Sequence, residues 1–336
     1  MSGPLAHAAT RHVSQPAPRV PPRLRRWRGK LRQWVDATAG TDDDPRADRI
    51  DWLRAAPFVA LHLGCLGVLW VGVSPAALVV AGALYALRMF ALTGFYHRYF
   101  SHRTFRTSRA VQFVFAVLGA SCVQRGPLWW AAHHRNHHRK SDTPLDPHSP
   151  AIQGFLWSHM GWFLTPRAFR TDLARVPDLA KYPELRWLDR FDIAVPVLLA
   201  IALYVFGALL DHFAPSLHTG GAQMLVWGFF VSTVVLFHAA VTINSLAHRF
   251  GSRRFDTKDN SRNNAVLALL TFGEGWHNNH HFFPGSARQG FCWWEIDPTW
   301  YGLKLMAALG LVRDLHPVPA WVMARADKGH SACASP

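Results

Sequence analysis

The stretch PAALVVAGALYALRMFALTGFYHRYFSH, residues 75–102, joins a long apolar run to two histidines at its end. The run at 75–96 is long enough to cross a hydrocarbon core of about 30 Å at about 1.5 Å per helical residue. Similar runs elsewhere complete a set of four predicted transmembrane spans, which lie at about 55–73, 75–96, 193–210 and 222–243. A tight turn at Ser74-Pro75 and a short connection at 211–221 join them into two helical hairpins.

The composition agrees with a membrane protein. Half of the residues are apolar and only 17% are charged, whereas about a quarter is usual in soluble domains. The formal net charge is +15, and the basic residues lie in the segments between the apolar runs. This pattern favours contact with anionic lipid, and no motif of a nucleic-acid fold is present, so we expect no nucleic-acid partner.

The basic residues also predict the orientation. Neither hairpin tip contains Lys or Arg, while the arm at 1–50, the segment at 97–191 and the region after 244 are rich in both. Short loops with many basic residues stay on the cytoplasmic side. We therefore expect a multi-pass protein of a bacterial inner membrane, with both termini and a helical cap (97–191 and 244–315) in the cytoplasm.

The remaining segments have less distinct patterns. We expect a disordered basic arm at 1–50, one membrane domain at 51–320 and a flexible tail at 321–336. The weaker apolar stretches at 110–123 and 155–164 are too short to span and predict interfacial or re-entrant helices. Arg88 lies inside the second span near its cytoplasmic end, where snorkelling to the interface would accommodate its charge.

Histidine is the unusual residue of this chain, with 20 in 336. The pattern HxxHH occurs twice, starting at His134 and His277, and it places three imidazoles on one helix face. HRYFSH at 97–102 and NSLAH at 244–248 add further histidines, and all four motifs lie on the cytoplasmic side. His97 and His102 are five residues apart, about 140° around an ideal helix, so they require a helix end or approach from different sides.

These motifs supply nine histidines, more than the four ligands of one tetrahedral zinc, so they predict two metal ions. Imidazole binds Zn, Cu, Fe and Ni. Among these, a pair of iron ions that activates oxygen would fit a membrane protein that acts on an unreactive hydrocarbon chain. Carboxylates nearby would offset the charge of the ions and orient the rings; the candidates are Asp142, Asp146 and Glu274. His133 precedes the HxxHH frame and is left out of the predicted ligands, and His148 is assigned a supporting position.

The motifs resemble those of membrane acyl desaturases of the stearoyl-CoA desaturase type. The resemblance covers roughly 55–315 and rests on HRYFSH (97–102), HRNHHRKSDTPLDPHS (134–149), NSLAH (244–248) and GEGWHNNHHFFP (273–284). It implies an all-α integral membrane fold with four transmembrane helices and a cytosolic cap that holds a di-iron site. The implied iron ligands are His97, His102, His134, His137, His138, His248, His277, His280 and His281, with Asn244 acting through a water.

The resemblance also implies an activity. O2 would be reduced to water while a cis double bond forms in a saturated acyl chain, usually nine carbons from the carboxyl end. The methylenes need a narrow apolar tunnel, and five tryptophans near the motifs are candidates to line it: Trp129, Trp130, Trp157, Trp162 and Trp276. No haem or flavin is expected in the chain, so a ferredoxin, rubredoxin or cytochrome with its reductase would supply electrons.

One departure affects the acyl carrier, and several rival functions stay open. Animal relatives have an Arg-Asp pair associated with CoA where this chain has Ala132-His133, so acyl-CoA is the first expectation and acyl-lipid remains possible. The same kind of site also serves hydroxylases, ketolases and acetylenases. A metal transporter would need ligands at mid-membrane, where the spans have almost none, and a zinc hydrolase would act without a reductant.

Overall fold

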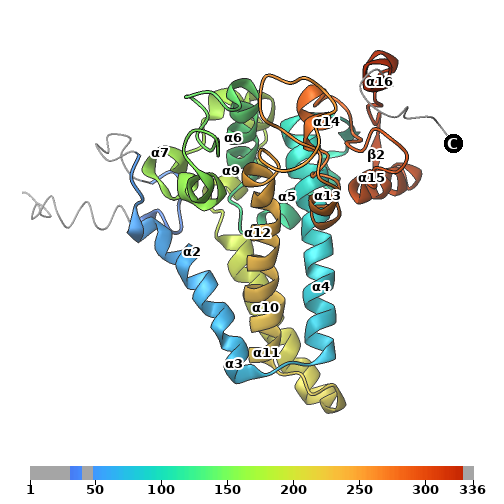
Figure 1. The fold of residues 1–336 in the computed structure, drawn as a ribbon. Helices are drawn as coiled ribbons and strands as arrows, with labels where there is room; N and C mark the ends of the chain where they lie inside the picture. Colours follow the sequence, from blue (N-terminus) through green and yellow to red (C-terminus); the bar gives the residue numbers. More distant parts are fainter. Residues whose placement is uncertain (1–30, 40–47, 328–336) are drawn as a thin grey trace, which may run out of the picture.

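The computed structural model describes residues 31–39 and 48–327. Most of the predicted basic arm therefore lies outside the described residues. The predicted tail begins inside helix α16 (Ala320–Asp327) and then continues beyond them. In Figure 1 the long helices form a stem, and the shorter helices form a cap at one end of it.

Among the described residues, four helices are long and apolar enough to cross a membrane, which confirms the predicted spans. They run over Trp52–Val71, Pro75–Ser101, Ala194–Phe213 and Gly221–Ser245, with mean hydropathies between 1.5 and 2.2. The first consists of α2 (Trp52–Gly64), η1 (Cys65–Gly67) and α3 (Val68–Val71), and the third is α10 (Ala194–Phe213). The fourth consists of α11 (Gly221–Leu225), η7 (Val226–Val231) and α12 (Ser232–Ser245).

The hairpin tips are joined to each other. Ser74 ends the turn between the first two spans, and its hydroxyl accepts a hydrogen bond from Ala77 N at 3.1 Å, which caps α4 (Pro75–Phe90). The same hydroxyl lies 2.6 Å from Thr219 Oγ1 in the other tip. Two buried hydroxyls thus connect the two hairpins at the end of the stem farthest from the cap.

The second span is longer than the sequence predicts. After α4 (Pro75–Phe90), the helix continues as the π-helix η2 (Ala91–Ser101), all of which is buried. A π-helix forms i→i+5 hydrogen bonds, so residues five apart lie nearly one above the other. This winding brings His97 and His102 together, with 5.0 Å between their ring centroids. An ideal α-helix would have pointed these rings apart.

The cap consists of short helices and one small sheet. Its first half contains α5 (Arg109–Ala120), α6 (Pro127–Lys140), η3 (Trp157–Gly161), η4 (Trp162–Leu164), α7 (Pro166–Phe169), η5 (Leu173–Arg175), α8 (Pro177–Ala180) and α9 (Pro183–Arg190). Its second half contains α13 (Ala265–Leu270), α14 (His277–Phe282), α15 (Pro298–Ala308) and α16. Strands β1 (Arg106–Thr107) and β2 (Val312–Arg313) pair antiparallel. Both weak apolar stretches form short, non-spanning helices, as predicted.

A continuous core attaches the cap to the second span. Phe95, Tyr96 and Phe100 of η2 are fully buried and pack with Leu128 of α6 and Leu185 of α9. Phe95 stacks on Phe115 of α5 with 3.9 Å between ring centroids. Because apolar burial is the main stabilising term, the helix that carries the first histidines is also the one most firmly held.

Arg88 does not snorkel, so this expectation was wrong. Its side chain is 1% exposed and points inward. It donates to Ser121 O at 3.2 Å, to Thr233 Oγ1 at 2.8 Å and to Ser232 Oγ. These acceptors belong to the fourth span and to the carboxyl end of α5, where a helix favours positive charge. Arg88 therefore joins α4 to two neighbouring elements inside the stem.

We expect Arg88→Leu to lower the free energy of unfolding by about 3 kcal/mol, because several buried polar groups lose their partner. Denaturant titration in detergent micelles measures this. Leu87→Ala is the matched control, since Leu87 is 44% exposed and should cost no more than about 0.5 kcal/mol. Equal effects of the two substitutions would show that Arg88 does not hold the stem together.

Candidate metal centre

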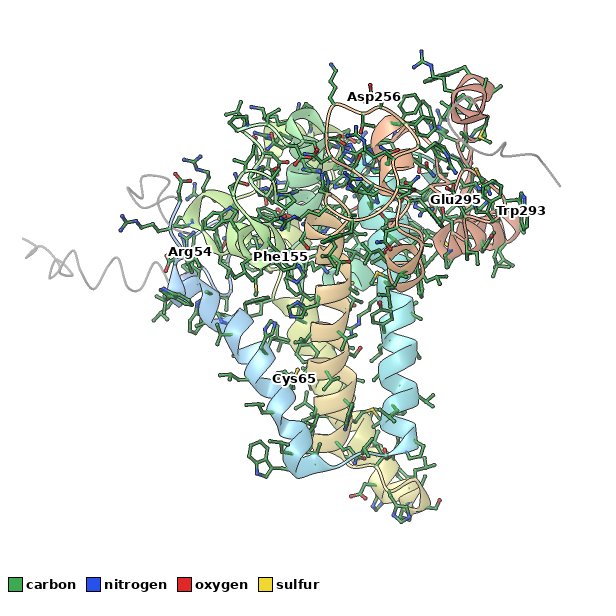
Figure 2. All side chains as sticks on the ribbon, viewed as in Figure 1. Arg54, Cys65, Phe155, Asp256, Trp293 and Glu295 are labelled. Atoms are coloured by element: carbon green, nitrogen blue, oxygen red, sulfur yellow. The ribbon has the colours of Figure 1, made fainter. Side chains whose placement is uncertain are left out.

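Four separate elements bring histidines to one place in the cap. They are the end of the second span, helix α6, the turn after α12 and helix α14. In Figure 2 many side-chain nitrogens gather below the segment that carries the labelled Asp256. These four elements are far apart in sequence, so the centre exists only in the folded chain.

The histidines form two groups, and in each group one ring nitrogen from every member lies within 4.8 Å of all the others. The first group has five members: His97, His102, His134, His138 and His280. The second has four: His137, His248, His277 and His281. Together they are the nine histidines that the resemblance implies as ligands. His133 belongs to neither group.

The two HxxHH motifs are divided between the groups in opposite ways. The motif in helix α6 gives His134 and His138 to the five-member group and its middle histidine, His137, to the other. Helix α14 does the reverse and gives only its middle one, His280, to the five-member group. Residues i and i+4 are about 40° apart around a helix, while i+3 lies about 100° from i+4. Each motif therefore serves both groups.

Predicted carboxylates fix the orientation of three rings. The Nδ1 atom of His137 lies 3.1 Å from Asp146, that of His248 lies 2.9 Å from Asp142, and that of His97 contacts Glu274. These are the three predicted carboxylates. Because an ionised carboxylate only accepts hydrogen bonds, each Nδ1 carries the proton and each Nε2 presents a lone pair to the centre.

Sequence reasoning missed two further residues that contact the histidine rings. Asp259 binds His281 Nδ1 at 2.7 Å, yet it lies in an irregular loop and belongs to no motif. Gln289 is 1% exposed, and its Nε2 lies 3.3 Å from His97 Nδ1 and 3.4 Å from His280 Nδ1. No spacing rule in the sequence connects either residue to the histidines.

The ring nitrogens approach one another closely at the middle of each group. The Nε2 of His280 lies 2.9 Å from the Nε2 of both His97 and His138. In the other group the Nε2 atoms of His248 and His277 are 3.0 Å apart. The buried Nε2 of His281 has no hydrogen-bond partner among the described residues. Convergent lone pairs of this kind repel one another unless a cation lies between them, so the donor set fits metal binding.

The electrostatics of the centre also suit metal ions. Burial, reinforced by neighbouring imidazoles, lowers the pKa of five rings well below the usual value: those of His102, His134, His138, His277 and His280. Burial likewise lowers the pKa of His281, to about 4, although Asp259 opposes the shift. Neutral imidazole is the form that binds a metal.

The carboxylates show the opposite behaviour. Burial alone would raise the pKa of Asp142, but its hydrogen bond with His248 holds it at about 2. Against the same effect of burial, hydrogen bonds with His137 and His281 keep the pKa values of Asp146 and Asp259 below their usual range. The shell around the neutral rings is therefore anionic and can offset the charge of bound cations.

His133 and His148 lie beside the two groups. His148 stacks on His137, with 4.3 Å between ring centroids, and its Nδ1 is 3.7 Å from Asp146. These three residues form a further possible site that shares His137 with the four-member group. His133 instead packs against Trp129, with ring centroids 4.4 Å apart, and lines an apolar cavity beside the centre.

An apolar cavity leads to the centre. It has a volume of about 260 Å³ and reaches from Phe58 and Leu61 of the first span to His134 and Asn244. A second cavity of about 50 Å³ shares His134 and Asn244 with it and continues to Met89, Leu92 and Thr93. The two cavities therefore share walls beside the histidines.

The five candidate tryptophans differ in position. Trp129, Trp130 and Trp162 line the larger cavity. Trp157 lines a separate pocket on the cap and donates to Pro147 O at 3.1 Å. Trp276 lines none of these three cavities, and its indole donates to Ile296 O at 2.8 Å.

Comparisons with known proteins identify the family of this chain. The fatty acid desaturase family model matches residues 73–313. An acyl-CoA 5-desaturase from Anemone leveillei is 41% identical over 269 residues, which cover 79% of each chain. An sn-1 stearoyl-lipid 9-desaturase from Anabaena variabilis is 36% identical over 287 residues, which cover 83% of this chain and 97% of the relative. The chain therefore belongs to the fatty acid desaturase family and is a multi-pass membrane oxidoreductase that acts on acyl chains.

Proposed function

We propose that this desaturase uses a di-iron centre and O2 to introduce a cis double bond at the ninth carbon of a saturated acyl chain. The observation that supports it most is the reciprocal division of the two HxxHH motifs between two histidine groups. One metal would need only one group, while desaturation is a redox reaction that zinc cannot perform. Iron supplies that redox chemistry when bound.

In this proposal the five-histidine group holds one ion and the four-histidine group holds the other, with Asn244 acting through a water. Asp142, Asp146, Asp259 and Glu274 accept the Nδ1 protons and so keep the Nε2 atoms directed inward. Burial lowers the pKa of six rings, those of His102, His134, His138, His277, His280 and His281, so these rings bind the ions without first having to lose a proton.

The cavities position the substrate. An acyl chain that enters the larger cavity and continues into the smaller one passes His134 and Asn244. The apolar walls exclude water, and the tryptophans hold the methylenes in one geometry. Per double bond, the acyl chain loses two hydrogen atoms, and one O2 takes up these with two electrons and two protons to give two waters.

The relatives differ in the acyl carrier and in the double-bond position for which they are named. The Anemone leveillei relative is named for acyl-CoA and the Anabaena variabilis relative for lipid; a relative from Arabidopsis thaliana is named for delta-7 desaturation of a galactolipid. We propose acyl-CoA as the substrate and acyl-lipid as the alternative. The basic cap supports a cytoplasmic orientation with both termini inside, in a bacterial inner membrane, where a separate ferredoxin, rubredoxin or cytochrome with its reductase donates electrons.

Expression in a desaturase-deficient host should produce a new monounsaturated fatty acid with its double bond at the ninth carbon, and gas chromatography with mass spectrometry locates the bond. His280→Ala should abolish the product, because His280 faces both His97 and His138. A hydroxylated or acetylenic product would instead support the related oxidations.

Metal analysis of the purified protein should find about two irons per chain, one for each group. His134→Ala should lower this content, because His134 belongs to the five-histidine group. The adjacent His133→Ala is the matched control and should retain both ions. Loss of iron from both variants, or from neither, would contradict the assignment of ligands.

Asp259→Ala should weaken iron binding about 10- to 100-fold in competition with a chelator, as the loss of a carboxylate behind a ligating histidine typically does. Asp259→Asn retains an oxygen that can accept the Nδ1 proton and should give an intermediate effect. Asp256→Ala is the control from the same loop, since that side chain is fully exposed. Similar iron affinities of the two alanine variants would show that Asp259 does not orient His281.

A further inference from the structure

One surface segment lies directly over the four-histidine group. Residues 249–262 connect the end of the fourth span to α13 and form no helix; we refer to them as the cover loop. In Figure 1 the chain between α12 and α13 runs over the top of the cap, at the end opposite the hairpin tips. Figure 2 shows Asp256 of this loop at the outer edge of the molecule.

The inner side of the cover loop contacts the histidine centre. Asp259 accepts the proton of His281 Nδ1 at 2.7 Å, and the backbone N–H of Asn260 donates to Asp142 Oδ2 at 2.8 Å. Asp142 in turn binds His248. Both histidines belong to the four-member group, so the loop joins the protein surface to this group in particular.

The loop is also held in a fixed shape. The amide oxygen of Asn278 accepts hydrogen bonds from the backbone N–H groups of Arg254 and Phe255, at 2.8 and 2.7 Å. Asn279 accepts from Asn263 at 2.8 Å, just beyond the loop. These two asparagines separate the histidines of the HNNHH motif, and both are fully buried. The motif therefore anchors the loop as well as supplying ligands.

The outer side of the loop is cationic. The segment contains five Lys or Arg residues and two Asp residues. Arg254 is paired with Glu295 and Asp259 faces His281. Arg249, Arg253 and Lys258 are exposed, and Arg253 also lies 3.6 Å from Asp256 on the same outer side. Phe250 is 59% exposed beside them. An exposed aromatic ring among cations is typical of a surface that binds an acidic protein.

Lipid does not explain this charge, because the loop lies at the end of the molecule away from the stem. The reaction itself requires an external reductant, and the rings of the four-histidine group are too deeply buried to touch one: the side chains of His137, His248 and His281 are 4%, 1% and 1% exposed. A carrier must therefore pass its electrons through a thin element of the surface. In the cover loop, Asp259 contacts His281 directly.

On the basis of the proposed function, we propose that the cover loop is the docking surface of the electron donor. The donor is a small acidic one-electron carrier protein, and its electrons enter at the four-histidine group. Two reduced carriers bind in turn for each double bond, each is oxidised by one electron, and the two protons come from water. Cationic side chains around the loop increase the rate of encounter with an acidic partner.

The test measures binding as well as turnover. The full chain is placed in phosphatidylcholine nanodiscs and titrated with an acidic [2Fe–2S] ferredoxin at two salt concentrations. The test variant is Arg253→Glu/Lys258→Glu. The control, Arg106→Glu/Arg186→Glu, changes the net charge equally at exposed positions outside the loop.

We expect the test variant to raise the ferredoxin Kd about tenfold or more and to weaken its salt dependence, while the control stays within about twofold. The KM for ferredoxin should rise in parallel, and turnover driven by dithionite and methyl viologen should not change. Equal effects of both variants, or tighter binding of a basic cytochrome c than of ferredoxin, would overturn the proposal. Absence of turnover with either reductant would count against the proposed function, while the Kd comparison still judges the docking surface.

Discussion

One ring nitrogen from each of nine histidines converges on the same part of the cap, and the rest of the structure depends on this convergence. Lone pairs at about 3 Å from one another repel, and burial lowers the pKa of six of the nine rings, which favours their neutral form. Carboxylates behind the rings hold the Nδ1 protons and prevent the nitrogens from turning away. Cations between the nitrogens would remove this repulsion, so the folding of the cap and metal binding are expected to be coupled.

The membrane spans provide the rigid support that this centre needs. The second span ends in a buried π-helix, which places His97 and His102 on one side, and Arg88 joins that span to α5 and the fourth span. Near the end of the fourth span, Asn244 lines both cavities. An acyl chain and a polar metal centre can thus lie side by side, because the boundary between stem and cap separates apolar from polar surroundings.

Much of this could be predicted from the sequence, because spans and HxxHH motifs are local patterns. The four apolar runs predicted the spans, and helical periodicity predicted that each HxxHH motif would present its rings together. The rest depends on contacts between distant segments. The π-winding after Phe90 has no sequence signal that we recognised, and the division of each motif between two groups needs the relative position of α6 and α14. Asp259 and Gln289 come from irregular segments, and the inward direction of Arg88 depends on acceptors 33 to 145 residues away.

Anomalous diffraction at the iron absorption edge, from crystals of the protein loaded with iron, examines the proposed centre directly. Two peaks are expected, one among His97, His102, His134, His138 and His280 and the other among His137, His248, His277 and His281. A single peak shared by both groups, or an active enzyme with no peak at either position, would contradict the di-iron assignment.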